Sequence, residues 1–251
     1  MDRPLRVLAL IALLVLGGGV FLWGSSRLRN ANVFVVQDVQ VIGNQFLSQE
    51  EVIRAAEFSS VANVWDDPQP LIDALVAHPL IQAAQLHRRL PSTVIIEIQE
   101  TRPVALVPMP TLQPVDEAGR LLPLDPAAHR LDLPILRLRS AATELEDGVP
   151  SREIRMLAAE AAHLTDLDPE LGAHVSELWL EADGSMGMAL LDPAVDIRFR
   201  APLTIAVLDR GLWTLEDALT RGDGAIPLHL DLRFADRVYV RFDGISFRPL
   251  P

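Results

Sequence analysis

One apolar run near the start of the chain constrains the fold more than any other feature of the sequence. Val7–Trp23 contains 17 residues without a charge, and Arg3 and Arg6 precede it. At 1.5 Å per residue, a helix over this run is just long enough to cross the hydrocarbon core of a bilayer. The sequence therefore predicts a cytoplasmic stub at 1–6, a transmembrane helix at 7–24, and a body tethered to the membrane by its N-terminus.

A cleaved secretory signal is the alternative explanation of the same run. Cleavage needs small residues after the apolar stretch, whereas this stretch is soon followed by the bulky or charged Arg27, Leu28 and Arg29. The chain has no cysteine, so a lipid anchor on that residue is also excluded. We therefore favour an uncleaved anchor. Two arginines lie on each side, and the free α-amino group slightly favours an N-terminus in the cytoplasm.

The composition limits the partners that the body can take. The chain of 251 residues has a net charge of −12, and its 22 basic residues are all arginine. Four of these arginines flank the apolar run, so the rest of the chain is more acidic still. An acidic body argues against nucleic acid and against anionic membrane surfaces as partners. After a linker at 25–32, the length leaves room for one or two domains.

Residues 33–103 predict a small mixed domain with the order β-α-α-β-β. Alternation around Val39 and Val41 predicts a first strand. Ser48 and Glu51 have the spacing of a capping box at the start of a helix, and a second helix begins near Pro68. Two strand-like runs follow, over 82–90 and 93–100.

Residues 104–251 predict a β-rich domain with two helices, so the fold class of the whole chain is α+β. Turns at 117–119 and 182–184 predict hairpins. Helical spacing of apolar residues covers about 150–164 and 201–219. The last two predicted strands are 226–233 and 237–242. Apolar surroundings suggest that three tryptophans lie in the core, namely Trp65, Trp179 and Trp213.

Several short strings resemble known proteins. The domain at 33–103 resembles a POTRA domain, through Val39–Asn44, Leu47–Val52, Leu90–Val94 and Ile98–Ala105. The order of anchor, POTRA-like domain and β-rich domain resembles the FtsQ/DivIB family of bacterial cell division proteins. Leu230–Phe234 followed by 237–240 resembles the closing string of that family, and Val115–Arg120 resembles its first β-domain hairpin.

No constellation of residues in the sequence indicates catalysis. None of the six histidines has another histidine three or four positions away, as a zinc motif would require. There is no Gly-rich phosphate loop and no nucleophile elbow. Asp231 and Arg233 lie on the same side of a predicted strand, where a structural salt bridge is expected. The sequence therefore predicts a protein that is not an enzyme and that uses no cofactor or metal.

The resemblance implies a scaffold that holds FtsB-like and FtsL-like bitopic proteins and helps to recruit the septal peptidoglycan synthase. Its place would be the inner (plasma) membrane at the division septum, with the body extracytoplasmic. The partner-binding residues carried over from the family are Phe234, Asp236, Val238, Tyr239, Val240, Arg241 and Phe242. Alternation leaves open whether Val238, Val240 and Phe242 or Tyr239 and Arg241 point outward. A recruitment surface is expected at Gly43, Asn44 and Gln45.

Two other classes of protein are consistent with parts of the sequence. A POTRA protein of outer-membrane assembly or secretion normally carries several POTRA repeats and a long barrel, which 251 residues cannot hold. A membrane-anchored cell-wall enzyme would need a catalytic cluster. Co-purification with small bitopic proteins would separate the scaffold from both.

Overall fold

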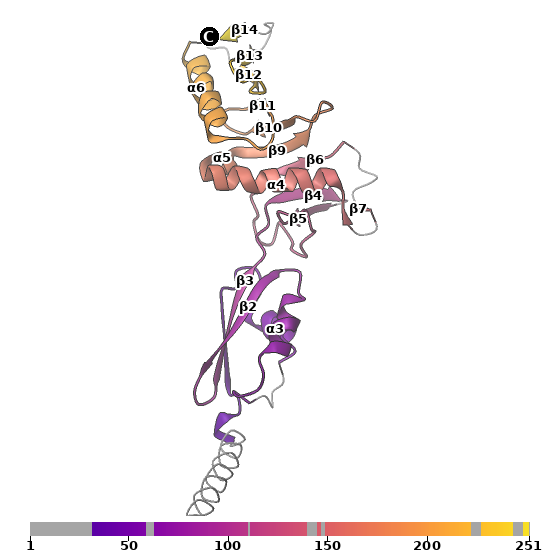
Figure 1. Ribbon diagram of the computed structural model, residues 1–251, viewed down its shortest axis with the longest axis vertical. Coiled ribbons are helices and arrows are strands. Elements are labelled where there is room, and N and C mark those ends of the chain that lie inside the picture. Colours follow the sequence, from indigo (N-terminus) through magenta and orange to yellow (C-terminus); the bar gives the residue numbers. More distant parts are fainter. Residues whose placement is uncertain are drawn as a thin grey trace, which may run out of the picture. The chain divides into compact units, whose positions relative to one another are not determined.

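The structure is a computed structural model that divides into two compact units, Met1–Thr101 and Arg102–Pro251 (Figure 1). It describes residues 32–58, 63–109, 111–139, 145–146, 149–221, 227–242 and 248–250. The predicted membrane span at 7–24 lies outside these residues. Within the described part, the structure contains no helix with the length and apolar character needed to cross a bilayer.

Between residues 32 and 101, the described part of the first unit contains a three-stranded sheet with two α-helices, as the sequence predicts. After a 3-10 turn at Asn32–Phe34, its elements are β1 (Asp38–Ile42), α2 (Gln49–Ala55), α3 (Gln69–Val76), β2 (Ile81–Arg89) and β3 (Thr93–Glu100). The strand order is β1-β3-β2, with β1 parallel and β2 antiparallel to β3. The order β-α-α-β-β is therefore confirmed.

Local sequence signals explain where the first helix begins. The Ser48 side chain accepts a hydrogen bond from the Glu51 amide, and the Glu51 carboxylate accepts one from the Ser48 amide at 2.8 Å. This reciprocal pair satisfies two amides that the first turn of a helix leaves without partners. Val52 and Leu75 from the helices are fully buried, as is Ile96 of β3, so helices and sheet share an apolar interior.

The second unit is built on a nine-stranded sheet with the order β14-β13-β12-β11-β10-β9-β6-β4-β5. Its strands are β4 (Ala105–Met109), β5 (Thr111–Val115), β6 (Ile135–Arg137), β9 (Val175–Leu180), β10 (Met186–Leu190), β11 (Val195–Phe199), β12 (Pro227–Asp231), β13 (Val238–Phe242) and β14 (Arg248–Leu250). A separate two-stranded ladder joins β7 (Leu145–Glu146) to β8 (Val149–Pro150).

Three helices supply the side chains that bury one face of this sheet. They are α4 (Arg152–Leu167), α5 (Pro169–His174) and α6 (Ile205–Arg221). Leu157 of α4 and Leu215 of α6 belong to one apolar core with Leu178, Ile197 and Val240 of the sheet. In Figure 1, α4 runs along the strands β9, β6 and β4, while α6 lies beside the C-terminal strands. By alternation, the other side chains of each strand point away from these helices.

Several details differ from the sequence-based expectations. The turn at 117–119 exists, but the strand after it is reduced to one bridge between Val115 and Leu121, and β5 pairs instead with β4. The short helix α5 and the last strand β14 were not predicted.

Trp65 and Trp213 are exposed by 42% and 61%, so their placement in the core was wrong. Trp179 is only partly buried and lies outside the apolar core, so its placement there was wrong too. At all three positions, apolar neighbours in the sequence do not correspond to a buried face.

Candidate interaction surfaces

The C-terminal edge of the large sheet carries the seven residues that were expected to bind a partner. We call this set the C-terminal edge surface: Phe234, Asp236, Val238, Tyr239, Val240, Arg241 and Phe242. Five of them lie on β13 itself, and Asp236 lies two residues before it. Phe234 lies in the turn after β12. The structure therefore brings all seven together at the end of one sheet.

The strand β13, which carries five of these residues, is not the open edge of the sheet. β14 pairs with it antiparallel, with Val238, Tyr239 and Val240 opposite Leu250, Pro249 and Arg248. The outermost strand is thus a three-residue segment that the sequence did not reveal, because Pro249 and the shortness of the segment give no strand pattern.

The structure shows which side chains of β13 face outward. Val238 and Val240 are buried, and Phe242 packs partly buried against the same core. Tyr239 is half-buried and Arg241 is exposed, so these two point to the sheet face that the helices leave bare. Of the expected contact residues, Val238, Val240 and Phe242 therefore stabilise the fold, whereas Tyr239 and Arg241 are available at the surface.

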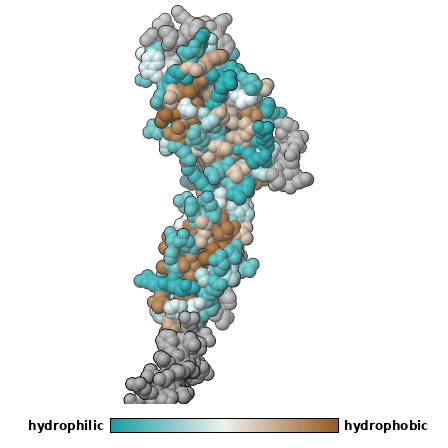
Figure 2. Space-filling model, in the orientation of Figure 1, coloured by the Kyte–Doolittle hydropathy of each residue, from teal (hydrophilic) through white to brown (hydrophobic). Residues whose placement is uncertain are grey.

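An exposed aromatic side chain stands beside this strand. Phe234 is 42% exposed, and its ring meets the Tyr239 ring edge to face with centroids 5.1 Å apart. Figure 2 shows apolar residues at the surface of both units among hydrophilic ones. Asp236 is exposed and accepts a hydrogen bond from Arg237 at 2.6 Å, and this bond lowers the pKa of its carboxyl.

Arg233 fixes the turn on which Phe234 stands. Its guanidinium donates two hydrogen bonds to Asp231, at 2.8 and 2.5 Å, and a third to Asp183 at 2.5 Å. The Asp231–Arg233 pair predicted from the sequence is therefore confirmed, and Asp183 joins β12 to the β9–β10 turn. Burial would raise the pKa of Asp231, but the bonds from Arg233 outweigh it and lower the pKa. Hydrogen bonds from Ser185, helped by Arg233, bring the pKa of Asp183 to about 2.

Polar and aromatic groups continue along the bare face of the sheet. The indole of Trp179 lies directly over Gly187, where a Cβ would meet the ring at 2.2 Å. Arg137 covers that indole at 3.9 Å from the ring centroid. The Trp179 N–H donates to Glu181 at 3.1 Å, and Glu181 also pairs with Arg198 at 2.9 Å. These contacts occupy both faces of the indole, so they brace the sheet and leave no open aromatic platform.

The expected recruitment surface in the first unit is a loop held by one carboxylate. Glu100 accepts hydrogen bonds from three consecutive amides, those of Gln45 at 2.9 Å, Phe46 at 2.7 Å and Leu47 at 2.9 Å. Gly43 has φ +87°, and a Cβ there would lie 2.1 Å from the Ile98 carbonyl oxygen.

The three residues of this recruitment surface differ in how strongly the loop conformation constrains them. Asn44 donates to the Leu47 carbonyl at 2.8 Å. Gly43 and Asn44 are thus required by the loop, and only the exposed side chain of Gln45 is unconstrained by these contacts.

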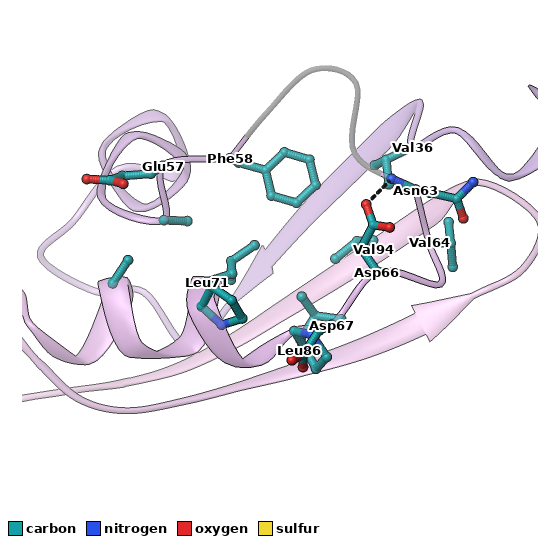
Figure 3. Close-up of a pocket in the computed structure, with 14 residues that line it drawn as sticks. Val36, Glu57, Phe58, Asn63, Val64, Asp66, Asp67, Leu71, Leu86 and Val94 are labelled. Carbon is teal, nitrogen blue, oxygen red and sulfur yellow. Dashed lines mark hydrogen bonds between the residues drawn. The ribbon is translucent and has the colours of Figure 1, made fainter. Parts of the chain in front are cut away.

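A pocket of about 230 Å³ lies between the helices and the sheet of the first unit (Figure 3). Phe58, Leu71 and Val94 supply apolar walls, and Asp66 and Asp67 also line it. None of its described lining residues is a basic or nucleophilic side chain, so the pocket offers apolar contact and no means to hold an anion. Across the described ranges, no three His, Asp or Glu side chains gather as ligands for a metal ion.

The two sets of predicted residues thus lie in different units. The sequence analysis missed one supporting carboxylate for each set: Glu100 for the loop at Gln45, and Asp183 for the turn that carries Phe234. The acidic residue of the Ile98–Ala105 string was quoted only as part of the resemblance, although it holds the loop at Gln45. No local signal connects Asp183 with Arg233, which are 50 positions apart.

Comparison with known proteins agrees with this architecture. Residues 34–101 match the POTRA domain, FtsQ-type. The chain is 29% identical over 238 residues to the cell division protein FtsQ of Myxococcus fulvus, covering 92% of this chain and 81% of that relative. It is 28% identical over 134 residues to FtsQ of Anaeromyxobacter sp., covering 51% and 44%. It is 34% identical over 89 residues to the cell division protein DivIB of Geobacillus kaustophilus, covering 35% and 34%.

Proposed function

Because this chain carries a POTRA domain of the FtsQ type and is similar to FtsQ and DivIB cell division proteins, we propose that it is a bitopic scaffold of the bacterial division machinery. The relatives support a role in cell division. The scaffold binds FtsB-like and FtsL-like proteins and helps to recruit and regulate the septal peptidoglycan synthesis complex. It acts by binding and has no catalytic activity of its own.

The C-terminal edge surface is the observation that carries this proposal. Phe234 is an exposed aromatic side chain on a turn held by three bonds from Arg233, so it can act as an anchor without a large loss of conformational freedom. Tyr239 and Arg241 lie beside it on the bare face of the sheet. Aromatic and arginine side chains on a rigid support are the typical anchors of protein interfaces.

A membrane tether raises the effective concentration of partners at this surface. The predicted helix at 7–24 keeps the body at the inner (plasma) membrane, with the N-terminus cytoplasmic and the body extracytoplasmic at the division septum. Partners that are themselves single-span proteins then meet it in two dimensions, which raises the effective concentration without new contacts. In this arrangement the POTRA domain serves recruitment to the septum, through Gln45 and the helix α2 that follows.

The proposal is tested by binding of the full chain, in detergent micelles, to the purified FtsB-like protein encoded by the same genome. Phe234→Glu is expected to weaken binding at least about tenfold, since it places a charge in the centre of the interface. Trp65→Glu is the matched control. Trp65 is also 42% exposed and also meets a second ring edge to face, that of Phe34, but it lies in the POTRA domain.

Two outcomes would contradict the proposal. Equal affinities of the wild type and Phe234→Glu, with unchanged melting curves, would remove the C-terminal edge surface from the interface. A pull-down from membranes could instead recover outer-membrane or secretion components in place of small bitopic proteins. That result would contradict the division scaffold, and only the assignment of the POTRA domain would remain. Phe242→Glu is a poor probe, because Phe242 packs against the core.

A further inference from the structure

The edge of β13, which an incoming strand would need, is already occupied by the chain itself. β14 pairs with Val238, Tyr239 and Val240. Any partner that extends the sheet at this edge must therefore either add outside β14 or take its place. The chemistry of β14 separates these two possibilities.

Pro249 makes the outer side of β14 a poor edge. An antiparallel pair that exchanges two backbone hydrogen bonds needs an N–H on both residues, and proline has none. Pro249 opposite Tyr239 therefore occupies a non-hydrogen-bonded position, and the neighbouring pairs Val238–Leu250 and Val240–Arg248 make the bonds. The backbone group that β14 turns outward at its centre is then the proline nitrogen, which cannot donate to a further strand.

β13 is a better edge for the addition of a strand than β14. β13 is two residues longer than β14 and contains no proline. Its two faces also differ in character. Val238 and Val240 are buried beneath α6, while Tyr239 and Arg241 lie on the bare face. An extended segment with apolar residues on the helix side and polar ones on the other would complete both faces.

We propose that β14 is an exchangeable strand, which covers β13 in the free protein and is displaced by an extended, antiparallel segment of the partner. This inference rests on the proposed function, since it describes how the partner reaches its site. The free protein is then protected against pairing with unrelated strands. Binding requires the fraction of molecules in which β14 has left, so the apparent affinity is lower than that of the bare edge.

A disulfide between Tyr239→Cys and Pro249→Cys tests the exchange directly. The chain has no cysteine, so this pair is the only one that can form. Non-hydrogen-bonded partners lie about 4.5 Å apart at Cα, within the range that a disulfide spans. The full-length double variant is titrated with the FtsB-like protein, oxidised and then reduced. Because Tyr239 belongs to the C-terminal edge surface, the reference is the reduced double variant and not the wild type. We expect the oxidised form to bind at least about tenfold more weakly than this reference.

The matched control is a disulfide that links β5, the opposite edge strand of the same sheet, to its neighbour β4. Leu106 and Pro114 are also direct partners in an antiparallel pair and also include a proline. Leu106→Cys with Pro114→Cys is expected to bind equally well in both redox states. An oxidised Tyr239–Pro249 variant that binds as well as its reduced form would overturn the exchange. Loss of binding in the wild type and in both reduced variants would overturn the proposed function, and the exchange with it.

Hydrogen exchange of the wild type gives a second readout that needs no substitution. On addition of the partner, the amides of Arg248 and Leu250 should exchange faster, while those of Val238 and Val240 stay protected. Unchanged or slower exchange at Arg248 and Leu250, together with tight binding, would mean that the partner adds outside β14 or elsewhere and would refute the proposal.

Discussion

The POTRA domain and the β-rich unit hold their functional loops in place by different means. In the first, Glu100 binds three consecutive amides of the loop that follows β1, and Gly43 fits against the Ile98 carbonyl. In the second, Arg233 joins the carboxylate of Asp231, at the end of β12, to that of Asp183 in the β9–β10 turn. A backbone cradle tolerates almost no change in shape, whereas a side-chain clamp at the surface can lose one contact and keep the others.

The sharpest way to test this difference is a substitution of glycine in each unit. Gly43→Ala places a Cβ 2.1 Å from the Ile98 oxygen at φ +87°, and we expect it to lower the free energy of unfolding of the POTRA domain by about 4 kcal/mol. Gly184→Ala has a similar φ, +83°, but meets no atom within 4 Å. It should cost only the backbone strain, about 1 kcal/mol. Urea denaturation followed by circular dichroism measures both, and equal losses would contradict the steric argument.

The carboxylate of the cradle should matter less than its glycine. Glu100→Gln keeps one oxygen acceptor but loses the charge that strengthens three bonds to amides, so we expect a loss of about 2 kcal/mol. Glu97→Gln is the control on the same strand. Its carboxylate pairs with His87 where both side chains are more than half exposed, so its loss should stay below about 0.5 kcal/mol. Similar unfolding midpoints for the two variants would show that Glu100 contributes no more than a surface charge.

The same contrast explains which parts of the fold could be predicted from the sequence. The POTRA domain is specified by local signals: the Ser48–Glu51 capping box, the proline at the start of α3 and the alternation of β3 all lie within a few residues of what they determine. In the β-rich unit the two long helices and several strands were predicted, but β4, α5 and β14 were not. The shortness of α5 and β14 and the prolines in β4 and β14 hide the usual patterns. The order of the strands in the sheet was also not predicted, because it depends on pairs far apart in the chain, such as β11 beside β12 across α6.

In the candidate surfaces, too, features set by near neighbours in the sequence could be predicted and features set by distant elements could not. The Asp231–Arg233 pair could be predicted because its members are only two residues apart at the end of β12. Whether Tyr239 or Val240 faced outward could not, since alternation gives the period and not the phase. The position of α6 sets the phase, and no short pattern encodes it.

The clamp in the β-rich unit can be weakened one contact at a time. The pKa of Asp183 is about 2, chiefly through Ser185 and less through Arg233. Ser185→Ala should raise it toward 3.8 by more than Arg233→Gln does, as carbon-13 titration of the carboxyl would show. Because the folded pKa is depressed, its contribution to stability is present above the unfolded value and is lost as the pH falls toward 2. A larger rise in Arg233→Gln would make Arg233 the main partner of Asp183.

The smallest effect is expected for Glu160→Gln, which changes a carboxylate buried inside the β-rich unit. Glu160 of α4 accepts a hydrogen bond from the Leu203 amide at 2.9 Å, and burial raises the pKa of its carboxyl in spite of that bond. A raised folded pKa means that ionisation costs stability, so this cost grows as the pH rises from the unfolded value through the folded one. Glu160→Gln retains an acceptor and removes the cost. Its free energy of unfolding at pH 7 should therefore equal or exceed that of the wild type by up to about 1 kcal/mol, whereas Glu160→Ala leaves the Leu203 amide without this acceptor and should lose about 1–3 kcal/mol. A pH-independent difference between Glu160→Gln and the wild type, measured by urea denaturation from pH 4 to pH 8, would contradict the assignment of a raised pKa.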